Sequence, residues 1–259
     1  MVKSLLPENA LTHWHQWSDG LSSRPVLVGA LSGGRSNRSF LLDSDLGKLV
    51  LRINGADALL PGTERHDEIN IWRAASQQGI APPLVFVDTR NRYLVSTYID
   101  NGLPQHPQTN PAVIDHAFKL LVGCHQLNVN ASQIDYFNHI EHYWQLIEAG
   151  NHPPDPSLVE QRQSMQQVLE SLIDSNTPSG LCHHDPVIQN FVGSPERLYL
   201  IDWEYAAIGL QVMDYAALAT EWEIDNATMH RQTGIDPGLL TDAKAIYAYL
   251  NALWQEIVV

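Results

Sequence analysis

Two short stretches in the second half of the chain carry polar residues at a spacing that could do chemistry. CHHDPVIQN, from Cys182 to Asn190, sets two histidines, an aspartate and an asparagine in one segment. LIDWEY begins at Leu200 and places Asp202 twelve residues after Asn190. Three interpretations are open: a metal-hydrolase cluster, a phosphoryl-transfer loop, or a polar turn between two strands.

The residue types favour the second interpretation. Adjacent side chains of a strand point to opposite faces, so His183 and His184 are poorly placed to bind one zinc ion. An Asp–Asn pair in a turn usually only stabilises the turn. Phosphoryl transfer needs a carboxylate near the attacking hydroxyl and oxygen ligands for Mg²⁺. Asp185, Asn190 and Asp202 can supply both if a hairpin returns the chain to the loop.

The first hundred residues have the pattern of short strands with one inserted helix. Thr63 can cap a helix over 64–78 that ends at Gly79. Runs rich in Val, Leu, Ile, Phe and Tyr predict strands at 26–30, 38–44, 48–54, 83–88 and 93–99. The prediction is a five-stranded antiparallel sheet with one helix, forming an N-terminal lobe over residues 1–99.

After residue 99 the pattern becomes helical. The stretch 181–202 is the exception, since GSPE there can turn between two short strands. Apolar residues at three- and four-residue spacing predict helices over 113–127, 139–150, 158–172, 213–222 and 237–258. The predicted class is therefore α+β, with a mainly helical C-terminal lobe over 100–259 that carries a short catalytic β-hairpin.

The composition argues against several classes of function. A net charge of -14, from 15 basic and 29 acidic residues, disfavours nucleic acid as a partner and is compatible with a cationic substrate. The apolar runs are too short to span a membrane and no signal peptide is evident, so we expect a cytoplasmic protein. Cys124 and Cys182 are too few for a disulfide scaffold and are expected to be buried. No oligomeric state is favoured.

The motifs of the second half resemble those of the aminoglycoside phosphotransferase and choline kinase superfamily, relatives of protein kinases. The resemblance rests on His183-x-Asp185-x4-Asn190, followed by Ile-Asp-Trp-Glu at 201–204. It implies a two-lobed protein-kinase-like fold that binds ATP and Mg²⁺. Asp185 would orient and deprotonate a substrate hydroxyl, and His183 would brace the loop. Asn190, which completes the catalytic loop, and Asp202 would hold Mg²⁺ against the ATP phosphates.

The resemblance extends to the first lobe, so that it covers about two thirds of the chain. LSGGRSNRSFLL at 31–42 looks like the loop that covers the ATP phosphates. Arg52 in VLRI stands where the strand cation belongs, and Glu68 in RHDE stands where its helix partner belongs. Arg52 would contact the phosphates and pair with Glu68. The other nucleotide contacts implied by the resemblance are Ser32, Gly33, Gly34, Asn37, Ser96, Thr97, Tyr98 and Ile99.

The sequence also departs from the protein-kinase pattern. Arg52 replaces a lysine and brings a fixed charge with fork geometry. The glycine-containing loop is not GxGxxG, so its hold on phosphate would rest on Ser and Asn side chains. Trp-Glu-Tyr follows Asp202, which resembles the choline, ethanolamine and thiamine kinase branch more than the antibiotic-modifying enzymes.

Acidic and aromatic residues near these motifs could recognise a cationic substrate. Aromatic faces with a carboxylate nearby hold trimethylammonium or thiazolium groups well. The stretch Thr220–Trp222 resembles one that helps to bind choline in choline kinases. The candidates for substrate contact are Glu204, Tyr205, Glu221 and Trp222, although single tryptophans more often belong to a core.

The sequence therefore predicts a kinase that phosphorylates a hydroxyl of a small cationic metabolite. Choline, ethanolamine and thiamine are the candidates, in that order. Two alternatives remain open: an aminoglycoside phosphotransferase, and a nucleotide- or metabolite-binding module without catalytic activity.

Overall fold

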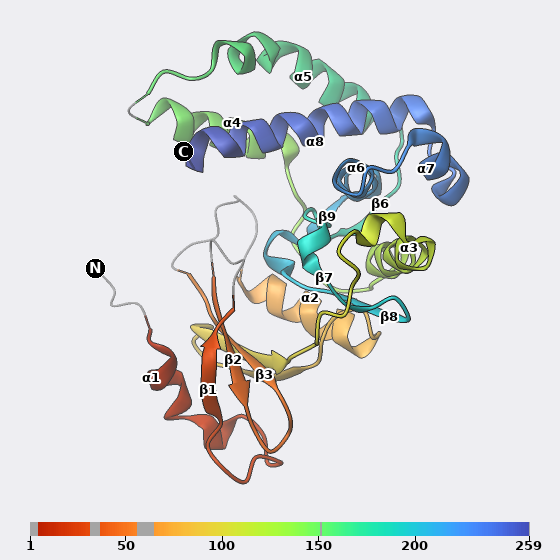
Figure 1. Cartoon of the computed structure of the whole chain (residues 1–259). Coiled ribbons are helices and arrows are strands. Elements are labelled where there is room, and N and C mark those ends of the chain that lie inside the picture. Colours follow the sequence, from red (N-terminus) through yellow and green to blue (C-terminus); the bar gives the residue numbers. More distant parts are fainter. Residues whose placement is uncertain (1–4, 32–36, 56–64, 151, 259) are drawn as a thin grey trace.

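The first part of the chain folds as a five-stranded antiparallel sheet (Figure 1). The structure is a computed structural model and describes all residues except 1–4, 32–36, 56–64, 151 and 259. The strands stand in the order β1-β2-β3-β5-β4, and each neighbouring pair is antiparallel. Their bounds are, in chain order, Val26–Ala30, Arg38–Asp43, Leu49–Ile53, Leu84–Val87 and Tyr93–Thr97. All five predicted strands are confirmed, within two residues at each end.

The two faces of strand β3 differ: one packs into an apolar core, and the other carries the charged side chain of Arg52. Leu49, Leu51 and Ile53 pack into a cluster with Trp17 and the short helix α1 (Pro7–Leu11). Side chains alternate along a strand, so Arg52 points to the other face. There its guanidinium lies over the ring of Trp72, 5.4 Å from the ring centroid.

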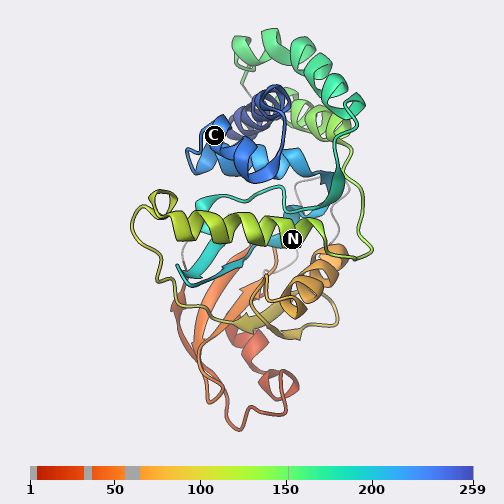
Figure 2. The ribbon, with the colours of Figure 1, turned by 90° about the vertical axis from the view of Figure 1, so that its right-hand side faces the viewer.

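Helix α2 (Arg65–Gln77) links β3 to β4 and lies between the sheet and the helical part in both views (Figure 1, Figure 2). It ends as predicted before Gly79, whose φ of 70° suits a residue without a side chain. The predicted cap, Thr63, lies outside the described residues. Ile71, Trp72 and Ala75 of α2 belong to the large core, which is built mainly by the helical part and includes Leu94 of β5, and not to the smaller core around Trp17.

The second part of the chain is mainly helical, as predicted. Its longest helix, α8 (Pro237–Val258), packs against α4, α5 and α6 (Figure 1). Asn110, Asp135 and Asp155 each cap a helix by accepting a hydrogen bond from a backbone N–H of the first turn. The remaining helices are α3 (Pro111–His125), α4 (Tyr136–Glu148), α5 (Pro156–Asp174), α6 (Gln211–Glu221) and α7 (Asn226–Thr233).

Two small sheets lie within the helical part. The predicted hairpin is present as β7 (Phe191–Ser194) paired with β8 (Arg197–Leu200). The second sheet pairs β6 (Ser179–Cys182) with β9 (Ala207–Leu210), and the sequence did not predict β9. These partners are four-residue strands separated by more than twenty residues, so their pairing depends on the tertiary fold. Short 3-10 turns at Trp14–Gln16, Pro107–Thr109, Ile188–Asn190 and Trp203–Tyr205 complete the elements.

Within the part of the chain that the structure describes, no helix has the length and apolar character needed to cross a membrane. The lobe boundary at residue 99 stays a prediction, and α2 packs with residues on the far side of it.

Candidate active site

His183 connects the backbones of the two motifs of the second half. It is fully buried, and its Nε2 lies 3.0 Å from the carbonyl of Ile201 while Nδ1 accepts a hydrogen bond from the Asp185 N–H at 3.3 Å. These partners require a neutral ring with the proton on Nε2. Burial lowers the pKa of His183 to about 4, which agrees with a neutral ring. His183 therefore links the Asp185 loop to the residue before Asp202.

Asp185 and Asn190 are in direct contact within the loop. The Asn190 amide nitrogen donates to Oδ2 of Asp185 at 2.8 Å and to its carbonyl at 2.9 Å. Burial raises the pKa of Asp185 to about 7, and the negative charge of Asp202 adds to this effect. The amide nitrogen of Asn190 is thereby used, so its Oδ1 is the atom left for another ligand.

The β7–β8 hairpin brings the chain back to Asn190. The residue that contacts Asn190 is Ile201, which directly precedes Asp202. The N–H of Ile201 donates to the Asn190 carbonyl at 2.9 Å. Asp202 itself has a φ of 68°, a left-handed conformation that is uncommon for a residue with a side chain. Burial and the nearby Glu204 raise the pKa of Asp202 to about 6, while Arg52 acts in the opposite direction. The predicted convergence of Asp185, Asn190 and Asp202 is present.

An ion pair between Arg52 of β3 and Glu68 of α2 lies beside Asp202. Nη2 of Arg52 lies 2.5 Å from Oε1 of Glu68, and its Nη1 lies 3.8 Å from Oδ1 of Asp202. The Arg52–Glu68 contact is a close ion pair, whereas Nη1 of Arg52 is buried without a hydrogen-bond acceptor among the described residues. Burial opposes the charge on Arg52, but Glu68 and Asp202 outweigh it and the pKa is raised.

Arg65 is a cation that the sequence analysis missed. Its Nη1 lies 2.9 Å from Oε2 of Glu68, three residues along α2. Glu68 therefore bridges two guanidinium groups. The signal was available, because an Arg and a Glu at i and i+3 on a helix face the same side.

The predicted nucleotide contacts outside Arg52 and Glu68 fall in three places. Ser32, Gly33 and Gly34 lie outside the described residues. Asn37 donates to Oε2 of Glu204 at 2.8 Å and accepts from the N–H of Gly55 at 3.1 Å. Ser96 is buried in β5, and the chain continues through Thr97, Tyr98 and Ile99 toward the helical part.

A cavity of about 250 Å³ opens beside these groups. Asp185, Asp202 and Glu204 line one part of it, and aromatic residues of α4 and α8 line another, namely Tyr143, Tyr247 and Trp254. Tyr143 and Trp254 stack at 5.9 Å between ring centroids. The sequence analysis missed these three aromatic residues, because helix periodicity alone marks them as core positions.

The four predicted substrate residues separate into two groups. Glu204 and Tyr205 line the cavity. Glu221 stands behind the wall, where it accepts a hydrogen bond from the Tyr247 hydroxyl at 3.0 Å. Trp222 is buried in the core against Phe191, and it is absent from the described cavity wall. The structure therefore does not support a substrate contact for Trp222, since its apolar ring is used in core packing.

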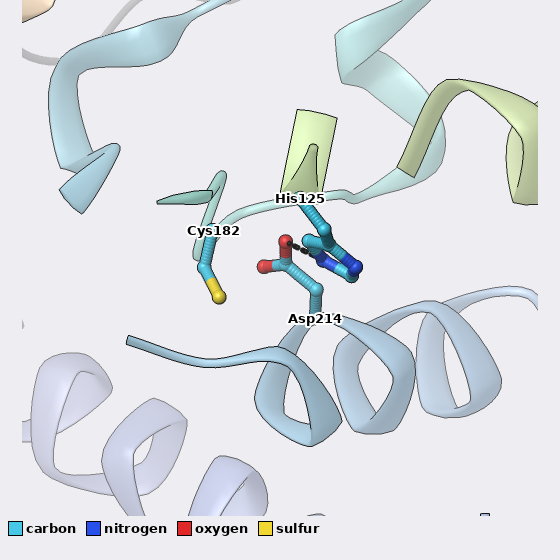
Figure 3. Close-up of side chains that lie close together, drawn as sticks. All are labelled: His125, Cys182 and Asp214. Carbon is cyan, nitrogen blue, oxygen red and sulfur yellow. Dashed lines mark hydrogen bonds and ion pairs between the residues drawn. The ribbon is translucent and has the colours of Figure 1, made fainter. Parts of the chain in front are cut away.

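Asp214 of α6 holds the start of the loop that carries Asp185, and its side chain meets that of His125 (Figure 3). Oδ2 accepts from the N–H of His183 at 2.8 Å and lies 3.0 Å from Nε2 of His125, and Oδ1 accepts from the N–H of His184 at 2.7 Å. Burial would raise the pKa of Asp214, but the hydrogen bond and charge of His125 outweigh it and lower the pKa to about 2. The carboxylate is fully buried and charged.

Cys182 lies beside this carboxylate (Figure 3), and the ligand atoms of His125, Cys182 and Asp214 are within 4.8 Å of one another. The two carboxylate oxygens already accept three N–H groups. Burial also raises the pKa of the Cys182 thiol, which disfavours the thiolate that a metal needs. We therefore interpret the cluster as a brace for the loop. Both cysteines are buried and free, as predicted.

Comparison with known proteins gives the class of the chain. The chain belongs to the phosphotransferase enzyme family, whose sequence pattern matches residues 28–250. Protein LicA of Haemophilus influenzae is 24% identical over 224 residues, which cover 83% of this chain and 62% of LicA. The chain thus spans about three fifths of the length of that relative.

Two solved structures share the fold. A choline/ethanolamine kinase family protein from Mesorhizobium loti gives a TM-score of 0.75 at 22% identity, covering 95% of this chain and 84% of the other. The choline kinase LicA from Streptococcus pneumoniae gives 0.73 at 23% identity, covering 89% and 86%. The predicted two-lobed protein-kinase-like α+β fold is confirmed.

Proposed function

We propose that this protein is an ATP- and Mg²⁺-dependent kinase that transfers the γ-phosphoryl group of ATP to a hydroxyl of a small cationic metabolite. The observation that carries the proposal is that Asp185 and Asp202 both line the cavity, with Asn190 hydrogen-bonded to Asp185 and the Arg52–Glu68 pair beside Asp202. Membership of a phosphotransferase family supports it. The division into a nucleotide-binding lobe and a catalytic lobe at residue 99, and a cytoplasmic location, are part of the proposal.

Asp185 is the residue that orients the acceptor hydroxyl and takes its proton. It lines the cavity, and Asn190 holds one carboxylate oxygen, which leaves Oδ1 for the substrate. A pKa of about 7 suits this role, because a general base works best when its pKa lies near the operating pH. Its alignment depends on His183 and Asp214, which fix the backbone on either side.

Asn190 and Asp202 are the residues that would hold Mg²⁺. An amide oxygen and a carboxylate are the ligand types that Mg²⁺ prefers. Burial and the negative charge of Glu204 raise the pKa of Asp202 to about 6, and a bound cation would favour the charged carboxylate against both effects. When bound, the metal supplies positive charge to the transferring phosphoryl group.

Arg52 is the residue that contacts the phosphates of ATP. Its Nη1 is buried without a hydrogen-bond acceptor among the described residues, which fits a site built for the oxygens of another molecule. Glu68 holds the guanidinium in place, and Arg65 adds a second positive charge at the same carboxylate.

The cavity supports a small cationic acceptor. No lysine or arginine within the described part of the chain lines it, whereas Asp185, Asp202 and Glu204 all do. Tyr143 and Trp254 offer aromatic faces for an alkylated ammonium group. Its volume of about 250 Å³ lies below the range of roughly 300–1,000 Å³ that is usual for drug-sized ligands, which favours a small alcohol over an aminoglycoside.

Among small alcohols we place choline and ethanolamine first and thiamine after them. The likeness to structures described as choline or choline/ethanolamine kinases supports this order. Aminoglycoside phosphorylation is the alternative within the enzyme class, and drug protection in cells would reveal it. A catalytically silent nucleotide-binding module is the alternative outside that class. The complete set of Asp185, Asn190 and Asp202 argues against the silent module.

The test is ADP release with ATP and Mg²⁺ against choline, ethanolamine, thiamine, an aminoglycoside and a sugar alcohol. We expect one small cationic alcohol to stimulate the wild type. Asp185→Asn should lose more than about a thousandfold in kcat, because one group supplies both alignment and base. ATP binding without stimulation by any acceptor would favour the silent module, and full activity of Asp185→Asn would remove that residue from the centre of the mechanism.

A further inference from the structure

Helix α2 is tied to the helical part of the chain at both of its ends. Near its start, Oδ2 of Asp67 accepts two hydrogen bonds from Ser132, one from the backbone N–H at 2.9 Å and one from the hydroxyl at 2.6 Å. Just after its end, the carbonyl of Ile80 accepts from the N–H of Leu200 at 2.8 Å. Leu200 closes the hairpin two residues before Asp202.

Ser132 belongs to a segment that is itself joined to the catalytic elements. Its carbonyl accepts from the N–H of Ile208 at 2.9 Å, and the Ile208 carbonyl accepts from the N–H of Ile134 at 2.9 Å. Ile208 lies in β9, which pairs with β6, the strand that leads into the catalytic loop. Ile134 lines the cavity. A continuous chain of hydrogen bonds thus runs from Asp67 to Ile134 at the cavity and to the strand that leads into the Asp185 loop.

The apolar packing also joins α2 to the helical part. Ile71, Trp72 and Ala75 of α2 pack in the large core that contains the buried residues of the helical part and also Leu94 of β5, whereas Leu49 and Leu51 of β3 pack in a second, separate core. The Arg52–Glu68 ion pair crosses this division, since Arg52 is on β3 and Glu68 is on α2.

We propose that the Asp67–Ser132 contact is a positioning contact for phosphoryl transfer. It holds α2, and with it Glu68, in register with the catalytic loop and the Asp202 turn. Arg52 then meets Glu68 at the joint between the sheet and this combined body, and the nucleotide phosphates bind across that joint. The inference rests on the proposed kinase function, and it assigns to Asp67 and Ser132 a role that acts through Glu68.

The local chemistry suits a fixed contact. Burial alone would raise the pKa of Asp67, but the two hydrogen bonds from Ser132 outweigh it and lower the pKa, so the carboxylate stays charged near neutral pH. Hydrogen bonds to a charged acceptor are stronger than those between neutral groups. Because Asp67 directly precedes Glu68 on the helix, a shift at one position is transmitted to the next.

The experiment measures ATP affinity by titration calorimetry, with Mg²⁺ present, and ADP release with the stimulating alcohol. The variants are Asp67→Ala, Ser132→Ala and the conservative Ser132→Thr. Asp115→Ala is the matched control, because Asp115 is an exposed helix carboxylate paired with Lys119 on α3. Asp67→Ala is also made in a Glu68→Gln background. Melting temperatures are recorded for every variant.

We expect Asp67→Ala to weaken ATP affinity and kcat/KM for ATP by about tenfold, the size expected for losing hydrogen bonds to a charged group. Ser132→Ala should lose less, since the backbone donor remains, and Ser132→Thr should retain activity. In the Glu68→Gln background Asp67→Ala should add little, because its effect passes through Glu68.

Two results overturn the inference while the kinase proposal stands: unchanged ATP affinity in Asp67→Ala, or a full additional loss in the Glu68→Gln background. If the melting temperature of Asp67→Ala falls while its ATP affinity is unchanged, the contact stabilises the fold only. If the wild type itself fails to bind ATP, the proposed function fails first.

Discussion

Replacing Asp214 with asparagine is expected to disable the site without touching any substrate. The two carboxylate oxygens accept from the N–H groups of His183 and His184, and Oδ2 also meets His125. Asparagine has one oxygen, so in either orientation its NH₂ group faces at least one backbone N–H. The less costly orientation keeps Oδ2 and leaves the N–H of His184 opposed by a second donor.

The magnitude follows from these contacts. One hydrogen bond to a charged acceptor contributes about 1.5–3 kcal/mol, and the donors left buried and unpaired cost about 1–3 kcal/mol more. The total of roughly 2.5–6 kcal/mol is a large share of a typical free energy of unfolding of about 5–15 kcal/mol. At about 2–4 °C per kcal/mol for a chain of this size, the melting temperature should fall by roughly 5–24 °C.

The loop that carries Asp185 should also move, and a displacement of about 1 Å at a reacting group can cost about a hundredfold in rate. The assays are thermal unfolding and ADP release, with Asp174→Asn as the control because Asp174 is exposed near the end of α5. The pKa of Asp214 is lowered to about 2, so its contribution to stability is present above about pH 4 and is lost as the pH falls toward 2. If Asp214→Asn keeps the wild-type melting temperature and activity, Asp214 does not hold the loop that carries Asp185.

Three further predictions concern the proposed catalytic groups directly. Asp202→Ala should abolish the dependence of ATP affinity on Mg²⁺, as measured by calorimetry with and without the metal; an unchanged metal dependence would exclude Asp202 as a ligand. Since burial raises the pKa of Asp185 to about 7 and the base must be deprotonated, kcat/KM for the acceptor alcohol should fall as the pH drops below about 7. A profile that is flat between pH 5 and 8 would exclude that titration. The same raised pKa means that the folded state loses stability as the pH rises from about 4 to 7, so Asp185→Asn should be more stable than the wild type at pH 8.

Local pattern in the sequence was enough for the strands, most helices and the residues of the two motifs. Strands such as Leu49–Ile53 are marked by their residue types and by turn residues at their ends, and those signals lie within a few positions. The order of Arg52, Glu68, Asp185, Asn190 and Asp202 along the chain was likewise visible, because each sits in a short motif. What the sequence determined by itself was therefore the family and the set of residues that we propose for catalysis.

The tertiary structure alone decided which distant residues meet. Strand β9, the Asp214 brace, and the aromatic wall of Tyr143, Tyr247 and Trp254 all depend on segments far apart in sequence. A tryptophan at helical spacing looks the same whether its ring faces a core or a cavity, so Trp222 was predicted at the site and Trp254 was not. The physical reason is that periodicity states which face of an element is apolar, whereas only the packing of elements states what that face covers.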